Sequence, residues 1–264
     1  MGLSEEDEVD RHSRKGTTRA FLRDGPAAGT TSVVVCVGDS ITEGGGSADW
    51  VAMLRARVGG GVQFVNDGVS GDLSWNVLQR LDATIQCEPD VVILLIGTND
   101  VAIANNDSRA ARWVRRWKHL EQEPTLEWYV ENVSAILRRL QAETSARIAV
   151  LEIPIMGEDL DGEMNRRVDE YNEGLHRVAE EFGVPCLPLH DRMVELLPPE
   201  HVPPPFSTSA RPLINSLYQH HVRRRTWDEA AASNGLVLLT DNTHLGERAG
   251  GILADLVADF VAAD

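Results

Sequence analysis

Residues 33–44 read Val-Val-Val-Cys-Val-Gly-Asp-Ser-Ile-Thr-Glu-Gly. The first five are apolar and four of them are β-branched, a composition that predicts a buried β-strand. The chain then turns at Gly38, and Ser40 follows just after the turn. Open α/β sheets place reactive groups beyond the carboxyl ends of their strands. The stretch therefore predicts an α/β fold and makes Ser40 a candidate nucleophile.

Strand-like and helix-like segments alternate along the rest of the chain. Apolar runs typical of buried strands occur at residues 33–37, 62–66, 90–96, 147–153 and 184–187. Apolar residues at helical spacing occupy residues 47–58, 73–86, 125–143, 162–182 and 247–262. This alternation predicts βαβ units with right-handed crossovers and a parallel sheet.

Three stretches depart from this alternation. Residues 1–30 are polar and charged, and we expect a poorly ordered N-terminal extension with a short packed piece around Phe21. Residues 31–264 are expected to form one domain. Within it, the arginine-rich residues 101–124 and the proline-rich residues 188–235 are insertions that follow strands. Long insertions at that edge of a sheet often act as lids or substrate walls.

Both insertions contain aromatic residues at helical spacing. Trp113 and Trp117 lie four residues apart, which favours packing on a helix over contact with a substrate. In the second insertion, a helix is expected to run through Leu213, Leu217, His220 and Trp227.

The net charge of the protein excludes some classes of binding partner. The chain has 41 acidic and 25 basic residues, a formal net charge of −16. Nucleic acid and anionic membranes would be repelled, so we expect no nucleic-acid partner. The small-molecule substrate that we expect follows from the site residues described below. Residues 1–30 lack the apolar core of a signal peptide, and no segment has the length and apolarity of a membrane span.

The cysteines and histidines predict neither disulfides nor metal binding. The three cysteines are odd in number and far apart, which is typical of reduced thiols in a cytoplasmic protein; they are Cys36, Cys87 and Cys186. The histidines show no metal-ligand spacing, and no glycine-rich phosphate or dinucleotide motif is present. We therefore expect no metal and no cofactor.

A second stretch supplies the groups that would activate Ser40. A serine hydroxyl needs a base to take its proton, and the base needs an orienting partner. Asp241 and His244 occur in Thr-Asp-Asn-Thr-His-Leu, so one loop can present both side chains. The loop follows the apolar residues 236–239, interpreted as a strand end like the one before Ser40. We predict that Ser40 is the nucleophile, His244 the base and Asp241 the orienting acid of an acyl-transfer site.

Acyl transfer also needs hydrogen-bond donors aimed at the developing oxyanion. The candidates are the backbone N–H of Ser40, the backbone N–H of Gly71 in Gly-Val-Ser-Gly-Asp, and the side-chain amide of Asn99 in Gly-Thr-Asn-Asp. Taken alone, Gly71 and Asn99 are each more typical of an ordinary turn, but the three candidates follow three different strands. Asp39 and Asp100 lie beside these donors and are expected to brace the loops.

Four short blocks carry a resemblance to a known family. In chain order they are Gly-Asp-Ser-Ile-Thr-Glu-Gly, Gly-Val-Ser-Gly-Asp, Gly-Thr-Asn-Asp and Asp-Asn-Thr-His-Leu. They resemble the four sequence blocks of the SGNH hydrolases, also called the GDSL esterase/lipase superfamily, over residues 33–100 and 236–262. The resemblance implies a flavodoxin-like three-layer α/β/α sandwich around a parallel sheet of five strands. It also implies the roles given above to Ser40, Asp241 and His244, and the same oxyanion hole.

These observations together predict a serine esterase. It would hydrolyse short-chain, acetyl-type esters of soluble alcohols or sugars through an acyl-enzyme. The site residues do not distinguish this activity from that of a thioesterase or an acyltransferase. A flavodoxin-like binding module without catalytic geometry is the alternative from another class.

Overall fold

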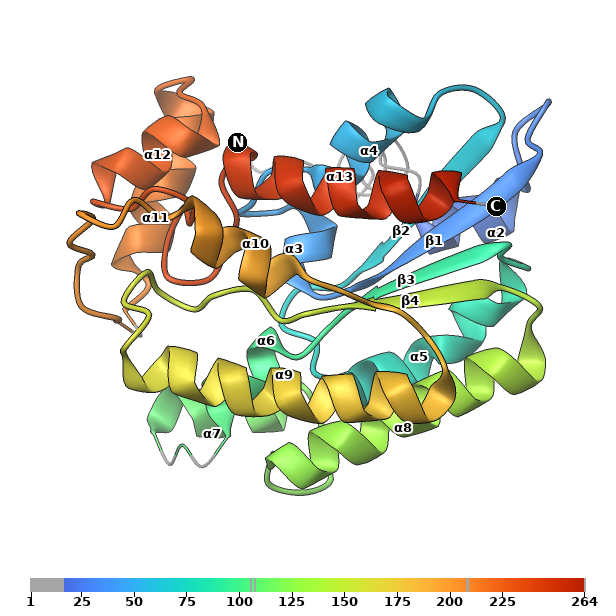
Figure 1. Ribbon diagram of the computed structural model, residues 1–264, viewed down its shortest axis with the longest axis horizontal. Helices are drawn as coiled ribbons and strands as arrows, with labels where there is room; N and C mark the ends of the chain where they lie inside the picture. Colours follow the sequence, from blue (N-terminus) through green and yellow to red (C-terminus); the bar gives the residue numbers. More distant parts are fainter. Residues whose placement is uncertain (1–16, 105, 107, 208, 264) are drawn as a thin grey trace.

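The computed structural model describes residues 17–104, 106, 108–207 and 209–263. A parallel sheet of five strands lies between two layers of helices (Figure 1). This is the α/β/α arrangement that the alternating sequence predicts. The strands are β1 (Ser32–Gly38), β2 (Val62–Gly68), β3 (Val91–Leu95), β4 (Arg147–Leu151) and β5 (Cys186–Leu187).

The strand order β2–β1–β3–β4–β5 determines where a site can form. All neighbouring strands pair in parallel, so their carboxyl ends share one edge of the sheet. The chain goes from β1 outward to β2, but from β3 outward to β4 on the other side. Loops that leave adjacent strands in opposite directions open a crevice between them. Ser40 follows β1 and Asn99 follows β3, so both lie at this crevice.

One helical layer packs on the sheet through a large apolar cluster. It consists of α4 (Trp50–Val58), α10 (Leu189–Leu196) and α13 (Glu247–Ala262), which lie above the sheet in Figure 1. Their buried side chains meet the strand residues that point to this face, including Val34, Cys36, Ile93 and Leu151. Helix α10 belongs to the stretch that the sequence predicts to be a proline-rich insertion, yet its Leu189 and Met193 are buried in the core.

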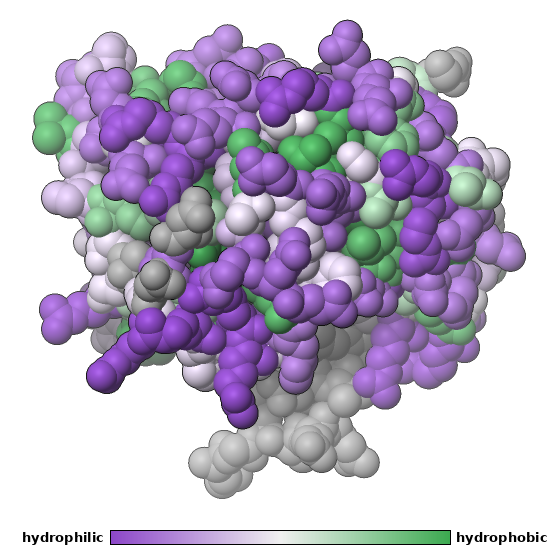
Figure 2. Space-filling model, turned by 90° about the horizontal axis from the view of Figure 1, so that it is seen from below, coloured by the Kyte–Doolittle hydropathy of each residue, from purple (hydrophilic) through white to green (hydrophobic). Residues whose placement is uncertain are grey.

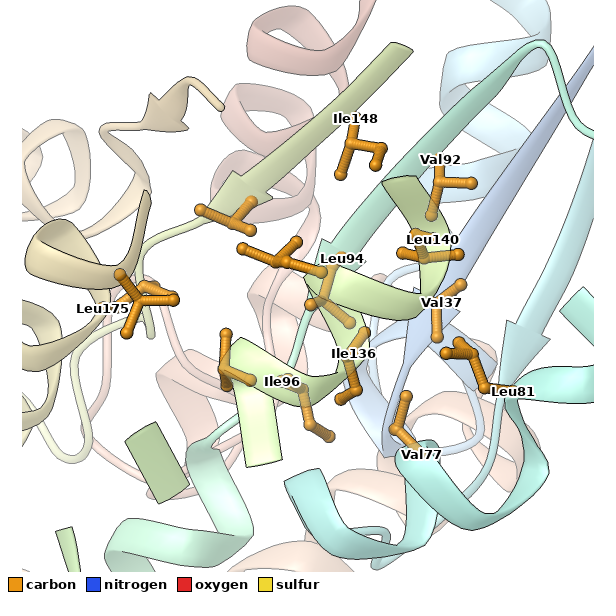
Figure 3. Close-up of a cluster of buried hydrophobic side chains, with 14 of the residues drawn as sticks. Val37, Val77, Leu81, Val92, Leu94, Ile96, Ile136, Leu140, Ile148 and Leu175 are labelled. Atoms are coloured by element: carbon orange, nitrogen blue, oxygen red, sulfur yellow. The ribbon is translucent and has the colours of Figure 1, made fainter. Parts of the chain in front are cut away.

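The opposite layer consists of α5 (Ser74–Gln86), α8 (Leu126–Glu143) and α9 (Glu163–Phe182). Figure 3 shows its core, in which the helix residues Val77, Leu81, Ile136, Leu140 and Leu175 surround the strand residues Val37, Val92, Leu94 and Ile148. Successive strand residues thus serve opposite faces, as the period of a strand requires. The outer surface in Figure 2 is mainly hydrophilic, with separate hydrophobic spots.

The described part of the expected N-terminal extension contains a helix. Helix α2 (Thr18–Asp24) buries Phe21 in the core beneath the sheet. The hydroxyl of Thr18 donates to Asp67 Oδ1 at 2.7 Å, which fastens the helix to the end of β2. Residues 1–16 of the expected extension lie outside the described residues.

The second insertion does not contain the single helix expected through Trp227. It forms α11 (Arg211–Leu217), a π-helical turn η1 (Tyr218–Val222) and α12 (Trp227–Ser233). The helix stops because Arg224 adopts a positive φ of 59°. Thr226 then starts α12 through a capping box with Glu229. The prediction of one helix was wrong because the apolar residues keep helical spacing on both sides of the break. The positive φ of Arg224 and the capping box of Thr226 divide the segment all the same.

The first insertion forms α6 (Thr98–Ile103) and α7 (Arg109–Trp117). Both lie below the sheet in Figure 1, beyond the end of β3. In the part of the chain that the structure describes, no helix is long and apolar enough to cross a bilayer.

Candidate active site

Ser40 is held at the sheet edge by a short helix, α3 (Ser40–Glu43). Asp39 caps this helix, and its Oδ1 accepts a backbone N–H two residues on at 2.9 Å. The helix lies directly against the end of β2, since a Cβ at Gly68 would lie 2.2 Å from the backbone nitrogen of Glu43. Glycine at position 68 therefore allows the close approach that places Ser40 at the crevice.

Three side chains predicted from distant parts of the sequence meet at this point. His244 Nε2 lies 3.0 Å from Ser40 Oγ, and His244 Nδ1 lies 2.9 Å from Asp241 Oδ2. The other carboxylate oxygen of Asp241 accepts the backbone N–H groups of Thr243 at 2.7 Å and His244 at 2.8 Å. One carboxylate therefore shapes the loop and also orients the imidazole ring.

The apolar run before this loop is not the strand end that the sequence suggested. Leu239 makes only an isolated bridge to Leu245. The backbone N–H groups of residues 237–239 donate instead to the buried carboxylate of Glu158, at distances of 2.7–3.0 Å. A side chain thus supplies the acceptors that a neighbouring strand would have supplied.

Glu158 is a residue that sequence reasoning missed. It lies 81 residues before Leu239, and nothing in its local sequence indicates a distant backbone partner. His201, from the second insertion, places Nε2 2.7 Å from Glu158 Oε2. The carboxylate therefore connects the second insertion to the loop that carries Asp241 and His244.

Replacing Glu158 with glutamine is expected to lower the free energy of unfolding by about 1–3 kcal/mol. An amide can keep its oxygen at Oε1, which accepts all three N–H groups, but it then turns an N–H₂ group toward the Val237 N–H and His201 Nε2, which now face Oε2. Urea unfolding measures the loss, with Glu173→Gln on the exposed face of α9 as the matched control. Equal stability of the two variants would contradict the bracing assigned to Glu158.

The three candidate oxyanion donors come from the ends of three adjacent strands. Asn99 Nδ2 donates to the backbone oxygen of Asp72 at 3.0 Å and lies 3.4 Å from Asp39 Oδ2, so it joins the loops after β1, β2 and β3. Gly71 has a φ of 74°, in the left-handed region that favours glycine. Within the described residues, the backbone N–H groups of Ser40 and Gly71 donate to no protein acceptor.

Charged groups fix the loop after β2. The carboxylate of Asp72 pairs with Arg80 at 2.7 Å and with Lys118 at 2.8 Å. Arg80 also donates to the backbone oxygens of Gly38 and Asp67, each at 2.9 Å, which joins the ends of β1 and β2. Sequence reasoning missed Arg80 and Lys118 because only the folded chain brings them to Asp72.

The electrostatics of the site favour a protonatable imidazole. Burial of the His244 ring opposes its charged form, but the hydrogen bond to Asp241 and the negative charges of Asp241, Asp39 and Glu43 outweigh burial and raise the pKa of His244. Burial also acts to raise the pKa of Asp241, yet hydrogen bonds from His244 and Thr243 and the charge of His244 lower it. The pair is therefore arranged to stabilise an imidazolium beside a carboxylate.

The two aspartates expected to brace the loops are both buried. Burial raises the pKa of Asp39 to about 6, although the helix cap and His244 oppose the rise. Burial raises the pKa of Asp100 to about 7, against hydrogen bonds from Ser74. Asp100 accepts the Ser74 N–H at 3.0 Å and its hydroxyl at 2.6 Å, so it links the loop after β3 to α5.

Both insertions reach the site. A Cβ at Gly71 would lie 2.8 Å from the ring of Trp117, so this ring lies beside the loop after β2. A Cβ at Gly46 would lie 3.0 Å from Leu213 and 3.8 Å from the ring of His244, so Leu213 lies beside the histidine. The two segments therefore border the site at different loops.

Trp113 and Trp117 pack on each other, and Trp117 also lies against Lys118. The two indole rings stack with centroids 5.1 Å apart, and 62% and 47% of the respective residues remain exposed. In the described part of the chain, no three His, Cys, Asp or Glu side chains gather as metal ligands would. What the arrangement offers is a hydroxyl, a base in contact with it and donors around them.

Comparisons with known proteins identify the family of the chain. Residues 36–204 match the GDSL-like lipase/acylhydrolase family. The chain is 28% identical over 176 residues to the thioesterase 1/protease 1/lysophospholipase L1 of Escherichia coli K12, over 65% of this chain and 73% of the relative.

Solved structures share the fold at low sequence identity. The acetyl xylan esterase AlAXEase has a TM-score of 0.60 at 17% identity, over 87% of this chain and 99% of its own. The acetylxylan esterase Axe2 of Geobacillus stearothermophilus has a TM-score of 0.58 at 18% identity, over 89% and 96%. Two further structures of Axe2 are of catalytic mutants in which a serine or a histidine is replaced by alanine.

Proposed function

Because the chain belongs to the GDSL-like lipase/acylhydrolase family and is a carboxylic ester hydrolase, we propose that Ser40, His244 and Asp241 are its catalytic triad. The observation that carries the proposal is the 3.0 Å contact between Ser40 Oγ and His244 Nε2, across 204 residues of sequence. Asp241 and His244 lie beyond the residues that match the family, so their assignment rests on this contact and on the block that contains them.

The proposed cycle uses only side chains and backbone of this protein. Ser40 Oγ attacks the acyl carbonyl while its proton passes to His244 Nε2, and Asp241 stabilises the imidazolium. The N–H groups of Ser40 and Gly71 and the amide of Asn99 donate to the oxyanion. The alcohol leaves with the proton from His244. Water, deprotonated by His244, then hydrolyses the acyl-enzyme and restores Ser40.

Replacing Asn99 with alanine is expected to cost about 2.7–4 kcal/mol of transition-state stabilisation, or about 10²–10³ in kcat. The hydrogen bond from the amide to the substrate strengthens as negative charge develops on the carbonyl oxygen, so kcat should fall more than KM changes. Steady-state kinetics with p-nitrophenyl acetate measure both. An unchanged kcat would remove Asn99 from the oxyanion hole.

The raised pKa of His244 predicts the acid limb of the pH profile. Only the neutral ring can accept the proton of Ser40, so activity falls as the pH drops through the pKa of His244. For kcat/KM toward a neutral ester, we expect the midpoint of the acid limb to lie above pH ~6.5, the ordinary pKa of histidine. A limb centred at or below that value would contradict the effect assigned to Asp241.

For the substrate, we propose short, acetyl-type acyl esters. The proposal is supported by the acetylxylan esterases that share the fold, while the Escherichia coli relative favours thioesters or lysophospholipids as the second candidate. A panel of p-nitrophenyl esters from acetate to palmitate, acetylated sugars and acyl thioesters tests the two. We expect the highest kcat/KM for an acetyl ester, and a maximum for a thioester or for palmitate would overturn this choice.

The acceptor of the acyl group is proposed to be water. Added alcohols should leave free acid as the main product, because the proposed acceptor is water; predominant ester formation would identify an acyltransferase.

The proposed location of the protein is the cytoplasm. Cys36, Cys87 and Cys186 are free thiols, which supports this location. Fractionation of the native host tests it, and recovery outside the cytoplasm would contradict it.

A further inference from the structure

Helix α7 concentrates positive charge in a strongly acidic protein. Between Arg109 and Trp117 it carries four arginines and no acidic residue, while the whole chain has a net charge of −16. Arg109, Arg112 and Arg116 are exposed, whereas Ala111 on the opposite side is buried. The outward face of α7 is therefore cationic.

The same face carries the two stacked tryptophans. Trp113 and Trp117 are one helical turn apart and both exposed, with 62% and 47% of their surfaces accessible to solvent. Two exposed indole rings beside arginines form a surface suited to planar or apolar groups. Arginine complements carboxylate and phosphate oxygens through its planar array of donors.

This face adjoins the proposed oxyanion hole. The Trp117 ring lies within 2.8 Å of where a Cβ at Gly71 would lie, and Lys118 Cε lies within 3.0 Å of it. Lys118 Nζ donates to the backbone oxygen of Ser70, pairs with Asp72 and lies 4.3 Å from the centroid of the Trp117 ring. A molecule bound to the two rings would therefore lie next to the Gly71 N–H.

We propose that the outward face of α7, formed by Arg109, Arg116, Trp113 and Trp117, is a binding subsite for esters that carry an anionic group beside a planar or apolar portion. The inference rests on the proposed function, because it takes the reacting carbonyl to lie between Ser40 and Gly71. The net charge of −16 disfavours anions at the surface as a whole, so the arginines of this face would draw the anionic end of a substrate to it.

Two acetyl esters that differ in charge test the subsite. 4-Acetoxybenzoate is anionic and 4-acetoxybenzamide is neutral, while the acetyl group and the ring are shared. Each kcat/KM is divided by the rate of hydroxide hydrolysis, which removes intrinsic reactivity. We expect the wild-type protein to prefer the anion, and the preference to fall as salt is added. A third ester, 4-acetoxyphenyl phosphate, shows whether phosphate serves better than carboxylate.

Charge reversal at Arg116 should lower this preference. Arg116→Glu is compared with Arg177→Glu, an exposed position on α9 that changes the net charge equally. We expect the preference to drop by about fivefold or more in the first variant and to stay near wild type in the second. Trp113→Ala should lower kcat/KM for both esters, and Trp113→Phe should restore most of it. Equal preferences in the two arginine variants would overturn the subsite.

The outcomes separate the subsite from the proposed function. Hydrolysis of the neutral ester with a preference that Arg116→Glu does not change would reject the subsite alone. Failure to hydrolyse either ester, with no reaction at Ser40, would reject the proposed function. Binding to phosphatidylglycerol vesicles that Arg116→Glu abolishes, together with an unchanged ester preference, would assign this face to a lipid surface and overturn the proposal.

Discussion

Replacing Ser40 with alanine is expected to lower kcat toward p-nitrophenyl acetate by about 10⁴–10⁶-fold. The hydroxyl is the only atom group that the substitution removes, and it contacts His244 Nε2 at 3.0 Å. Without Oγ no acyl-enzyme can form, and the remaining oxyanion donors give only a small residual rate.

The fold should survive this change, because Ser40 is the first residue of α3 and the helix cap is supplied by Asp39. Circular dichroism and thermal unfolding check this point. Ser70→Ala is the control, since Ser70 lies in a Gly-Val-Ser-Gly turn that superficially resembles a nucleophile motif. Near-wild-type activity in Ser40→Ala, or a comparable loss in Ser70→Ala, would contradict the assignment of the nucleophile.

Replacing Asp241 with asparagine is expected to lower kcat by about 10⁴-fold, as in other serine triads. The Oδ1 atom accepts two backbone N–H groups, so an asparagine keeps its oxygen there and turns its N–H₂ toward His244 Nδ1. The ring must then carry its proton on Nε2, where it cannot accept the proton of Ser40. The variant should therefore keep the conformation of the loop but hold His244 in the tautomer that cannot act as the base.

The pH profile gives this variant a second readout. Loss of the carboxylate charge removes one of the groups that raise the pKa of His244, so the acid limb should move to lower pH. Asp169→Asn, on the exposed face of α9, controls for loss of one negative charge. A small loss of kcat with an unmoved limb would show that Asp241 does not orient the base.

The sheet could be predicted closely because its strands are nearly continuous apolar runs. β3 is buried over its whole length, and the apolar run at 90–96 predicted it within one residue at either end. β5 has only two residues, Cys186–Leu187, within a predicted 184–187. The break at Arg224 was missed because hydrophobic spacing does not report a single positive φ.

The reacting residues of the candidate site could be predicted, because acyl transfer needs particular residue types and these occur just after predicted strands. Ser40, His244 and Asp241 meet as their spacing and order suggested. The groups that hold them in place could not be predicted. Glu158 acts through backbone donors of residues 237–239, and Lys118 reaches Asp72 across 46 residues. Such contacts are decided by packing and have no local signal in the sequence.

The position of the site follows from the strand order. Adjacent strands β1 and β3 lead into loops that diverge, and Ser40 and Asn99 lie on these loops. The loop of His244 is fastened to the segment between α3 and α4, because Thr240 Oγ1 donates to the backbone oxygen of Gly46 at 3.0 Å. The strand order therefore determines where the reacting groups meet. The two insertions border the site and limit which molecules can reach these groups.

Covalent labelling with a fluorophosphonate, followed by peptide mass spectrometry, tests the central claim most directly. A serine activated by a neighbouring histidine attacks phosphorus and keeps the adduct. We predict that the label is found on the peptide containing Ser40, is absent in Ser40→Ala and forms much more slowly in His244→Ala. Labelling of a different serine, or no labelling of the folded wild-type protein, would contradict the proposed catalytic triad.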